Sequence, residues 1–349
     1  MLGPALYVKG GISALEKMII PFSDSEVSIE MLPTMHDLSL LGRFRHFGAR
    51  IFSWPVRSVY RRPDIVHIHM SHGLSTLRKL LLLRLWKISR VPVILHMHSS
   101  SFTDFFNRSP RILRWWISRG FYKADRVICL SESWKNYYSS ITDAPEGNFL
   151  IMPNPAPLPT VGKETEQTAK QTVLFSGRVG SRKGTFDLIE AWSKLPLETL
   201  RKSSLIIAGD GDITAVRKLT ESLSESCDIN VVGWVSDEKL RDLFRKSSIY
   251  VLPSRAEGVP IGIMEAMSYG SAIITTPVGG IPELISDGQN GIFVKPGSVA
   301  EITRALQKLI TDEKLRFQLS SEAMKTAESR GINNYMENLK RIWRSIGAS

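Results

Sequence analysis

The sequence has little cysteine and no long apolar run. Only Cys129 and Cys227 occur among its 349 residues, which is too few for a disulfide framework and is typical of a reducing, cytosolic setting. No segment approaches the roughly 20 uninterrupted apolar residues of a transmembrane helix. The nearest, LLLLRLW at 80–86, is short and contains Arg84. We therefore expect a cytoplasmic protein without a membrane-spanning helix.

Acidic residues are scarce in the first part of the chain. Residues 1–155 contain 20 Lys and Arg against 11 Asp and Glu, a net charge of +9, whereas the remainder contains 25 against 23, a net charge of +2. A basic half joined to a near-neutral half suggests that the first half faces an anionic partner. Nucleic acid, an anionic membrane and an acidic substrate all fit this charge. A basic surface that only keeps the protein soluble is the alternative.

Short β-branched runs alternate with amphipathic stretches, which predicts parallel sheets covered by helices. The chain is long enough for two domains of ordinary size. The strand-like runs of the first half are 64–70, 91–99 and 125–131, and those of the second half are 172–180, 204–212, 229–236, 249–258, 271–280 and 291–296. We therefore predict an α/β fold with two Rossmann-like, doubly wound domains that face each other across a cleft. In such sheets ligands bind beyond the carboxyl ends of the strands.

The proline-rich segment FLIMPNPAPLPT (149–160) is the clearest linker, because proline removes the donor that a sheet ladder needs. We predict an N-terminal domain over 1–155, a linker over 156–170, a second domain over 171–330 and a C-terminal helix over 331–349. That helix is expected to pack back on the first domain. MLGPALYVKGG at the start is typical of a shortened strand that runs into a glycine loop, so we expect further residues upstream.

The loop GRVGSRKG (177–184) follows a strand-like run and precedes a helix-like one. Its glycines permit close backbone approach, and Arg178 and Lys183 add two cations near a helix N-terminus, so a diphosphate-sized anion fits. A stray lysine in a helix-opening loop is the ordinary alternative. The loop is not a Walker A motif, because glycine follows Lys183. AGDGD (208–212) also lacks the last glycine of the dinucleotide fingerprint, since Thr214 stands there.

Two carboxylates lie eight positions apart in RAEGVPIGIMEAMSYG (255–270). Pro260 and its glycine neighbours suit the entry to a helix, which places Glu257 on the loop and Glu265 just over one turn into the helix. Both acids would then point toward the cleft, where they can accept hydrogen bonds from sugar or ribose hydroxyls. Spacing alone equally permits a capping or surface pair.

The order of these motifs identifies a family. The chain contains GRVGSRKG, AGDG, VGWV, PSRAEGVPIGIMEAMSYG and PVGGIPELISDGQNG in turn. It resembles the retaining glycosyltransferases of the family-four type, which have the GT-B fold. The resemblance covers nearly the whole second domain. In the first domain it depends on the Gly10-Gly11 loop, HMHS (96–99) and the basic residues around them.

The resemblance implies roles for individual residues. Glu257 would lie beside the donor sugar, Glu265 would bind the nucleotide ribose, and Arg178 and Lys183 would hold the diphosphate and neutralise the leaving group. Backbone amides at the helix N-terminus would also bind the diphosphate. The first-domain glycines would let the backbone approach the phosphates, and Val235 would contact the base through its main chain. The remaining implied donor-binding residues are Gly10, Gly11, Gly258, Val259, Pro260, Ile261 and Gly262.

The resemblance also implies that His98 borders the donor sugar, and it makes His98, Arg178, Lys183 and Glu257 the catalytic set. His67, His69 and His96 have the rival interpretation of strand-end residues. The resemblance implies front-side displacement, a mechanism in which the donor phosphate helps to deprotonate the acceptor hydroxyl. The expected donor is a nucleotide-diphosphate sugar, a UDP-sugar in the first place. No other cofactor and no metal are expected.

The acceptor is predicted from the basic aromatic segment RILRWWISRGFYKADR (111–126), which suits either a membrane interface or a core-facing helix. We expect a glycan or lipid-linked acceptor in cell-surface polysaccharide or glycolipid synthesis, at the inner face of the membrane. A nucleotide-sugar epimerase of the same fold is one alternative, although it would need further acids and histidines near the sugar. A basic nucleic-acid-binding module is another, and it lacks a recognisable motif. We expect no nucleic-acid partner.

Overall fold

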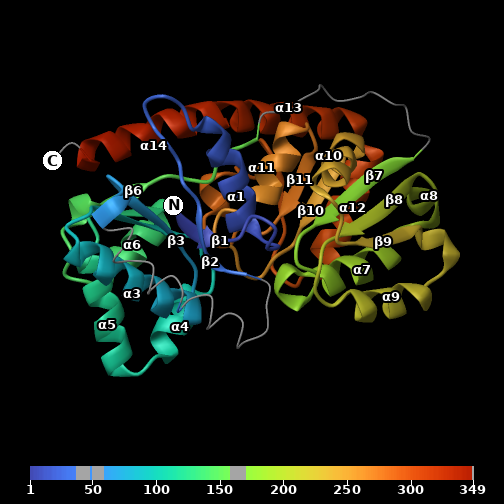
Figure 1. Ribbon diagram of the computed structural model, residues 1–349. Coiled ribbons are helices and arrows are strands. Elements are labelled where there is room, and N and C mark those ends of the chain that lie inside the picture. The colour runs from blue at the N-terminus through green and yellow to red at the C-terminus, as the bar shows by residue number, and fades with distance from the viewer. Residues whose placement is uncertain (37–47, 49–58, 158–169, 348–349) are drawn as a thin grey trace. The chain divides into compact units, whose positions relative to one another are not determined.

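A computed structural model describes residues 1–36, 48, 59–157 and 170–347 (Figure 1). The chain divides into two compact units, Met1–Asn154 with Ile332–Ser349, and Pro155–Gly331. Most of the linker that the sequence predicts at 156–170 lies outside the described residues. Among the described residues, every helix is too short or too polar to cross a bilayer.

The first unit contains a six-stranded parallel sheet in the order β2-β1-β3-β4-β5-β6. Its two central strands, β3 and β4, consist wholly of buried residues, as expected for strands covered on both faces. The strands are β1 (Leu2–Pro4), β2 (Leu32–Met35), β3 (Val66–Met70), β4 (Val93–Met97), β5 (Arg126–Cys129) and β6 (Phe149–Ile151).

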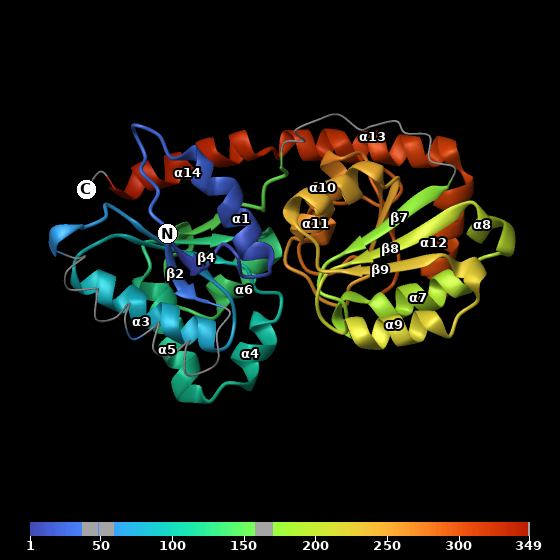
Figure 2. The same ribbon diagram turned by 45° about the vertical axis from the view of Figure 1, so that its right-hand side comes forward.

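Helices cover both faces of this sheet. Figure 2 shows α1 and α14 on one side and α3 and α5 on the other. Phe102 of α4, Phe121 of α5 and Tyr138 of α6 form aromatic pairs with one another and belong to the same core cluster as the strand residues. The helices are α1 (Gly11–Ile19), α3 (Leu74–Ile88), α4 (Phe102–Arg108), α5 (Arg111–Lys123), α6 (Glu132–Ser140) and α14 (Ile332–Gly347), with 3-10 turns η1 (Ile20–Phe22) and η2 (Glu146–Asn148).

Helix α14 belongs to the first unit although it ends the chain. Its buried residues Tyr335, Leu339 and Trp343 recur at helical spacing, and the indole Nε1 of Trp343 lies 3.1 Å from Nδ1 of His67 on β3. At its exposed edge Lys340 and Arg344 form ion pairs with Asp24 and Glu26 at 2.5 and 2.6 Å. Apolar burial and one indole hydrogen bond therefore fix this helix on the sheet.

The second unit repeats the architecture, with a parallel sheet in the order β12-β11-β10-β7-β8-β9. Its strands are β7 (Gln171–Ser176), β8 (Ser203–Ala208), β9 (Ile229–Gly233), β10 (Ile249–Leu252), β11 (Ala272–Thr275) and β12 (Ile292–Phe293). The order reverses beside β7, because the chain runs outward through β8 and β9 and then returns to place β10 on the other side of β7. This reversal is the switch point at which such sheets bind ligands.

The helices of the second unit also lie on both faces, with α7 and α9 below the sheet in Figure 2 and α10 and α11 above it. They are α7 (Thr185–Ser193), α8 (Leu197–Arg201), α9 (Ile213–Glu221), α10 (Asp237–Lys246), α11 (Ile261–Ser268), α12 (Val299–Thr311) and α13 (Glu313–Ser329). Three 3-10 turns complete the unit: η3 (Ser181–Lys183), η4 (Glu225–Cys227) and η5 (Ile281–Glu283).

The fold class predicted from the sequence is confirmed, and all nine named strand-like runs contain a strand. The linker prediction for 149–160 is wrong at its start, because Phe149–Ile151 form the edge strand β6. The sequence argument also missed β2, which contains Pro33. Both missed strands lie at an edge of the sheet, where a proline or a short run is tolerated because one side of the ladder is open.

Candidate functional site

Three loops meet at the carboxyl ends of neighbouring strands in the second unit. Residues 177–184 follow β7, residues 253–260 follow β10 and residues 276–280 follow β11, and these strands lie side by side in the sheet. The hydroxyl of Thr276 donates to the carbonyl of Ser254 at 2.6 Å, and the amide of Gly280 donates to the carbonyl of Gly258 at 2.7 Å. The loops after β10 and β11 therefore support each other.

Lys183 and Glu257 form a buried ion pair at this edge. Nζ of Lys183 lies 2.5 Å from Oε1 of Glu257, and the two side chains are 14% and 6% exposed. The hydroxyl of Ser254 donates to the same carboxylate oxygen at 2.6 Å. The structure thus brings together a cation from the first loop and an acid from the second, 74 positions apart in sequence.

Arg255 ties these two loops together through their backbones. Its amide donates to the carbonyl of Arg182 at 2.8 Å, and its guanidinium donates to the carbonyl of Ser181 at 3.0 Å. The same guanidinium donates to both carboxylate oxygens of Asp187 at the start of α7. Sequence reasoning missed Ser254, Arg255 and Asp187. The only signal for the first two is that they stand three and two positions before Glu257.

Glu265 lies on α11 and is half-buried, and its carboxyl group forms no hydrogen bond with any residue that the structure describes. Burial raises the pKa of its carboxyl group to about 7, and the negative charge of Asp237 acts in the same direction, against Arg241. Both Glu265 and Glu257 contribute to the raised pKa of the Tyr250 hydroxyl, which burial mainly causes. At neutral pH the carboxyl group of Glu265 is therefore partly ionised, and a hydrogen bond from a ligand hydroxyl would favour the ionised form.

The segment from Gly258 to Gly262 leads into α11, with Pro260 as the residue before the helix and no side chain capping the helix N-terminus. Val259 and Ile261 are buried, so this segment offers only its backbone to a ligand. A Cβ atom at Gly262 would lie 2.5 Å from the hydroxyl of Tyr250, which explains the glycine there. The amides at this helix start favour an anion.

Arg178 is exposed in the loop after β7. That loop packs on the AGDG turn, because the amide of Val179 donates to the carbonyl of Asp210 at 2.6 Å and the amide of Asp212 donates to the carbonyl of Val179 at 3.1 Å. Asp210 and Asp212 thus belong to a turn that supports the Arg178 loop. Val235 is half-buried just after β9, behind Gly233 with its positive φ of 72°.

The remaining predicted residues belong to the first unit. Gly10 has a φ of 146° and precedes Gly11, where α1 begins. His98 follows β4 and is half-buried, and its Nε2 lies 2.9 Å from Nδ1 of His69. Burial, together with the imidazoles of His96 and His67 nearby, holds the pKa of His98 well below its usual value. His98 is therefore neutral at physiological pH.

A separate pocket of about 560 Å³ in the first unit contains none of the predicted residues. It includes Pro92, Asp125 and Arg126, at the amino ends of β4 and β5, and Lys87, whose Nζ lies 2.9 Å from Asp125. Because parallel α/β sheets bind ligands at the opposite, carboxyl edge, we do not assign this pocket to the reaction.

Comparisons with known proteins bear on the whole chain. Residues 160–326 match the family model for glycosyl transferases group 1, and residues 21–158 match the model for glycosyltransferase family 4. An uncharacterized glycosyltransferase of Haemophilus influenzae is 26% identical over 62% of this chain and 61% of its own length. The alpha-D-kanosaminyltransferase of Streptomyces kanamyceticus is 26% identical over 75% of this chain and 72% of its own length.

The fold also has close structural counterparts. The solved structure of HepE from Anabaena in complex with UDP-glucose superimposes with a TM-score of 0.74 and 17% identity, over 99% of both chains. At that identity the likeness shows the GT-B fold alone. Taken with the two family models, which between them match both units, these findings show that the chain belongs to the family-four, group 1 glycosyltransferases.

Proposed function

We propose that this chain is a retaining glycosyltransferase that moves a sugar from a nucleotide-diphosphate sugar to a glycan or lipid-linked acceptor without a metal ion. The observation that carries the proposal is the buried Lys183–Glu257 pair beside the hydrogen-bond acceptor Glu265, at the switch point of the second sheet. A UDP-sugar is the proposed donor, as in the HepE complex with UDP-glucose.

The proposed division of roles follows from charge. Lys183 and Arg178 bind the diphosphate and stabilise the negative charge that develops on it when the glycosidic bond breaks. Glu257, which shares Lys183 with the incoming phosphate, accepts hydrogen bonds from sugar hydroxyls. Glu265 accepts from the ribose, and the amides at the start of α11 add a positive end to the site.

The proposed chemistry is front-side displacement. The acceptor hydroxyl attacks the anomeric carbon from the face that the leaving diphosphate departs from, and a phosphate oxygen takes the hydroxyl proton. This arrangement requires cations at the phosphate and no protein nucleophile, so Glu257 binds the sugar without forming a covalent intermediate. Analysis of the product by NMR tests this, because the anomeric configuration of the donor is expected to be kept.

A panel of nucleotide-diphosphate sugars in a thermal-shift assay tests the donor class. A ligand at 100 times its Kd raises the free energy of unfolding by about 2.7 kcal/mol, so one donor is expected to raise the Tm clearly. Lys183→Ala and Glu265→Ala are expected to abolish that shift. Lys194→Ala is the matched control, since Lys194 is exposed and only pairs with Glu190. A shift that survives in Lys183→Ala would contradict the proposed site.

Chelation tests the metal-independent mechanism. Because Lys183 and Arg178 are proposed to supply the positive charge at the phosphate, activity is expected to be unchanged after treatment with EDTA. Loss of activity with EDTA and its return with Mn²⁺ would contradict the proposal.

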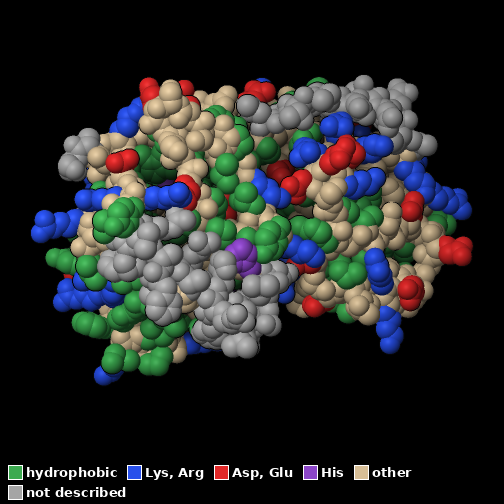
Figure 3. All heavy atoms as spheres, in the orientation of Figure 1, with side chains coloured by type: hydrophobic (Ala, Val, Ile, Leu, Met, Phe, Trp, Pro, Cys, Tyr) green, Lys and Arg blue, Asp and Glu red, His purple; other side chains and the backbone are tan. Residues whose placement is uncertain are grey.

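The acceptor side of the proposal depends on the outer surface of α5 in the first unit. Ile112 and Trp115 are 77% and 60% exposed there, and the guanidinium of Arg119 lies 6.0 Å from the ring centroid of Trp115. A pocket of about 470 Å³ beside Trp115 is lined by Arg111 and Arg114. Figure 3 shows hydrophobic and basic side chains intermixed at this lower-left part of the molecule.

Trp116, in contrast, packs against the core cluster with Arg84 stacked 4.1 Å above it. One tryptophan of α5 thus packs against the core, and the other is exposed. Exposed Trp and Ile among arginines suit the headgroup region of an anionic bilayer, where apolar side chains insert and arginines bind lipid phosphates. We propose that this surface docks on such a membrane at its inner face and so meets a lipid-linked acceptor.

Co-sedimentation with liposomes tests the docking surface. Binding is expected to increase with the fraction of phosphatidylglycerol and to decrease in the double variant Arg114→Ala/Trp115→Ala. The control is Phe317→Ala, which removes an even more exposed aromatic residue from α13 in the second unit. Binding that is indifferent to anionic lipid, or that Phe317→Ala weakens as much, would contradict this part of the proposal.

A further inference from the structure

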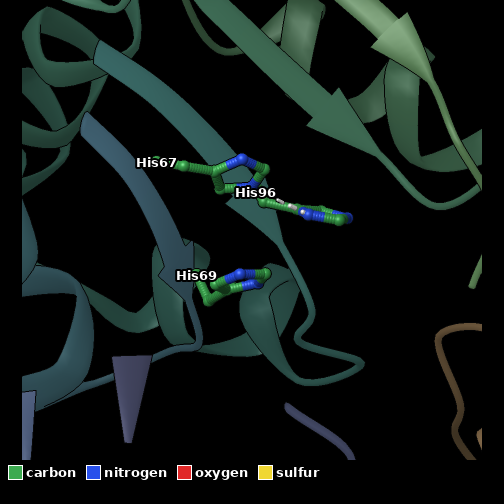
Figure 4. Close-up of side chains that lie close together, drawn as sticks. All are labelled: His67, His69 and His96. Atoms are coloured by element: carbon green, nitrogen blue, oxygen red, sulfur yellow. Dashed lines mark hydrogen bonds between the residues drawn. The ribbon is translucent and has the colours of Figure 1, made fainter. Parts of the chain in front are cut away.

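Four histidines lie together on one face of the first sheet. His67 and His69 come from β3 and His96 from β4, where His69 and His96 are direct partners in the register, and His98 follows two residues later. The first three are buried. Figure 4 shows their rings gathered on the same side of the two strands. The imidazoles could therefore be either metal ligands or hydrogen-bond partners of one another.

The geometry at first permits a metal. One ring nitrogen from each of His67, His69 and His96 lies within 4.8 Å of the others, and three histidines form the protein part of some zinc sites. A ligand nitrogen must, however, present a lone pair, so the positions of the ring protons decide the matter. Trp343 supplies that information.

The indole Nε1–H of Trp343 can only donate a hydrogen bond, and it lies 3.1 Å from Nδ1 of His67. Nδ1 of His67 is therefore an acceptor, and the proton of this neutral ring is on Nε2. That nitrogen lies 3.2 Å from Nδ1 of His96 and donates to it. His67 thus has no lone pair left for a metal. His96 carries its proton on Nε2, which is buried and has no hydrogen-bond partner among the described residues.

The second pair joins His69 to His98, with Nδ1 of His69 lying 2.9 Å from Nε2 of His98. Nε2 of His69 is buried and has no hydrogen-bond partner among the described residues. If His98 were the donor, this buried Nε2 would carry a second unpaired N–H in the cluster, beside that of His96. If His69 donates, Nε2 carries only an unpaired lone pair, and buried acceptors without a partner are the more common case in proteins.

We propose that His69 is a positioning residue that donates to His98, so that His98 carries its proton on Nδ1 and offers that N–H to an oxygen of the transferred sugar. The sugar assignment rests on the proposed function. Nδ1 of His98 makes no hydrogen bond with the described residues, and it is not among their buried unpaired atoms. His98 then acts as a hydrogen-bond donor and not as the base that deprotonates the acceptor.

The surroundings keep the arrangement uncharged. Burial lowers the pKa of His96 to about 3, and burial together with the neighbouring imidazoles holds the pKa of His69 well below its usual value. Burial makes a charge on any one ring unfavourable. A second charge would also be repelled, because the rings of His96 and His98 are only 4.1 Å apart and those of His67 and His69 are 4.7 Å apart. Burial lowers the pKa of Lys79, which contacts the His69 carbonyl, to about 7, and its positive charge lowers the pKa values of His69 and His98 further. The imidazoles therefore stay neutral in the physiological range in both charge states of Lys79.

NMR of the full chain with ¹⁵N-labelled histidine tests the proton positions without any substrate. Long-range ¹H–¹⁵N spectra, assigned with single histidine variants, are expected to show Nε2–H for His67 and His96 and Nδ1–H for His69 and His98. Equimolar Zn²⁺ is expected to leave these signals unchanged. An Nε2–H form of His98, an imidazolium at pH 7, or zinc-induced shifts of the cluster would overturn the inference.

Substitution of His69 tests the consequence for the reaction. His69→Leu removes one hydrogen bond, worth about tenfold in rate, so kcat is expected to fall about tenfold while the Kd for UDP stays within about twofold, because UDP lacks the sugar. His69→Asn, whose amide replaces the Nδ1 donor, is expected to recover most of kcat. Equal losses of kcat in both variants, or loss of UDP binding in His69→Leu, would mean a merely structural role.

Trp343→Phe is the matched variant for the other pair. It removes the donor to His67, so the signals of His67 and His96 are expected to change while His98 keeps Nδ1–H. A change at His98 would show that the pairs are not independent and would overturn the assignment of His69 as the positioning residue. If the wild-type proton positions hold but no nucleotide sugar binds, the proposed function fails while the histidine arrangement stands.

Discussion

The carboxyl edges of the two sheets carry opposite kinds of chemistry. At the edge of the second sheet Lys183, Glu257 and Glu265 are charged or can become charged. At the edge of the first sheet the imidazoles of His69 and His98 are paired and neutral. The same architecture thus places an ion pair after the strands of one sheet and paired, uncharged imidazoles at the corresponding edge of the other.

This difference suggests how two domains of the same fold can recognise different parts of one substrate. A nucleotide-diphosphate sugar has a charged half and a neutral half, and the proposed function assigns the diphosphate to the second unit and a sugar oxygen to the first. Part of the +9 charge of residues 1–155 lies on exposed surfaces, as with Arg111 and Arg119 on α5, and Lys79 is buried with its Nζ donating to the carbonyl of His69. Net charge of a domain therefore says little about the charge of its site.

The largest effect is expected from Lys183→Ala. The substitution leaves Glu257, 6% exposed, without its cation, and loss of one partner of a buried pair costs about 3–5 kcal/mol. Urea unfolding is expected to show this loss, and calorimetry is expected to show no donor binding. Lys183→Ala/Glu257→Gln is the control: it is expected to regain stability without regaining binding. A double variant that still binds donor would show that donor binding at the second sheet does not need the charge of Lys183.

Ser254→Ala should have the next largest effect. The Ser254 hydroxyl is the second donor to Oε1 of Glu257, at 2.6 Å in a buried setting, and loss of such a bond costs about 1–3 kcal/mol. Stability is expected to fall by this amount while Lys183 still pairs with Glu257. Ser286→Ala, on the loop after η5, serves as the control. No loss of stability would show that Lys183 alone holds the acid.

Glu265 should make the stability of the second unit depend on pH. Its pKa is raised from 4.5 to about 7, so the folded state binds more protons than the unfolded state between these values, and stability falls as pH rises through that window. The contribution is on the order of 3 kcal/mol, from about 1.36 kcal/mol per pKa unit. Donor affinity should change in the opposite sense and rise with pH, because the ionised carboxylate accepts hydroxyl hydrogen bonds.

Titration of stability and donor affinity from pH 5 to 8, in wild type and Glu265→Gln, measures both trends. The variant is expected to flatten the stability curve above pH 5 and to bind donor weakly at every pH. A wild-type affinity that falls as pH rises through 7 would contradict this role of Glu265.

The smallest effect should come from the exposed ion pairs of α14. Arg344 pairs with Glu26, both more than half exposed, and such pairs contribute little because water screens them. Arg344→Ala is expected to leave the Tm unchanged within error, whereas Trp343→Phe in the same helix should lower it, because the indole is buried against His67. Equal effects would mean that α14 is held by its charges.

The sequence predicted the parallel strands because β3, β4 and β10 are short β-branched runs that are buried on both faces. It did not predict β2 and β6, since edge strands need neither an unbroken ladder nor continuous apolar residues, and Pro33 hid the first of them. These edges affect the border of the first sheet and not the site.

For the site, spacing and the family resemblance identified Lys183 and Glu257 as functional residues, and the structure shows them paired. Spacing could not identify Arg255, whose guanidinium joins the two loops through contacts with Asp187 and the Ser181 carbonyl. Nor could it orient the protons of His67 and His96, because these depend on Trp343, which lies 276 residues beyond His67. Long-range hydrogen bonds leave no periodic trace in a sequence.

Hydrogen–deuterium exchange with UDP-glucose tests the central claim most directly. The account predicts that the nucleotide sugar protects the loops at 177–184 and 254–265 in the second unit, and that Lys183→Ala abolishes this protection. Protection confined to the pocket formed by Lys87, Asp125 and Arg126 at the opposite edge of the first sheet, with the two loops unchanged, would contradict it.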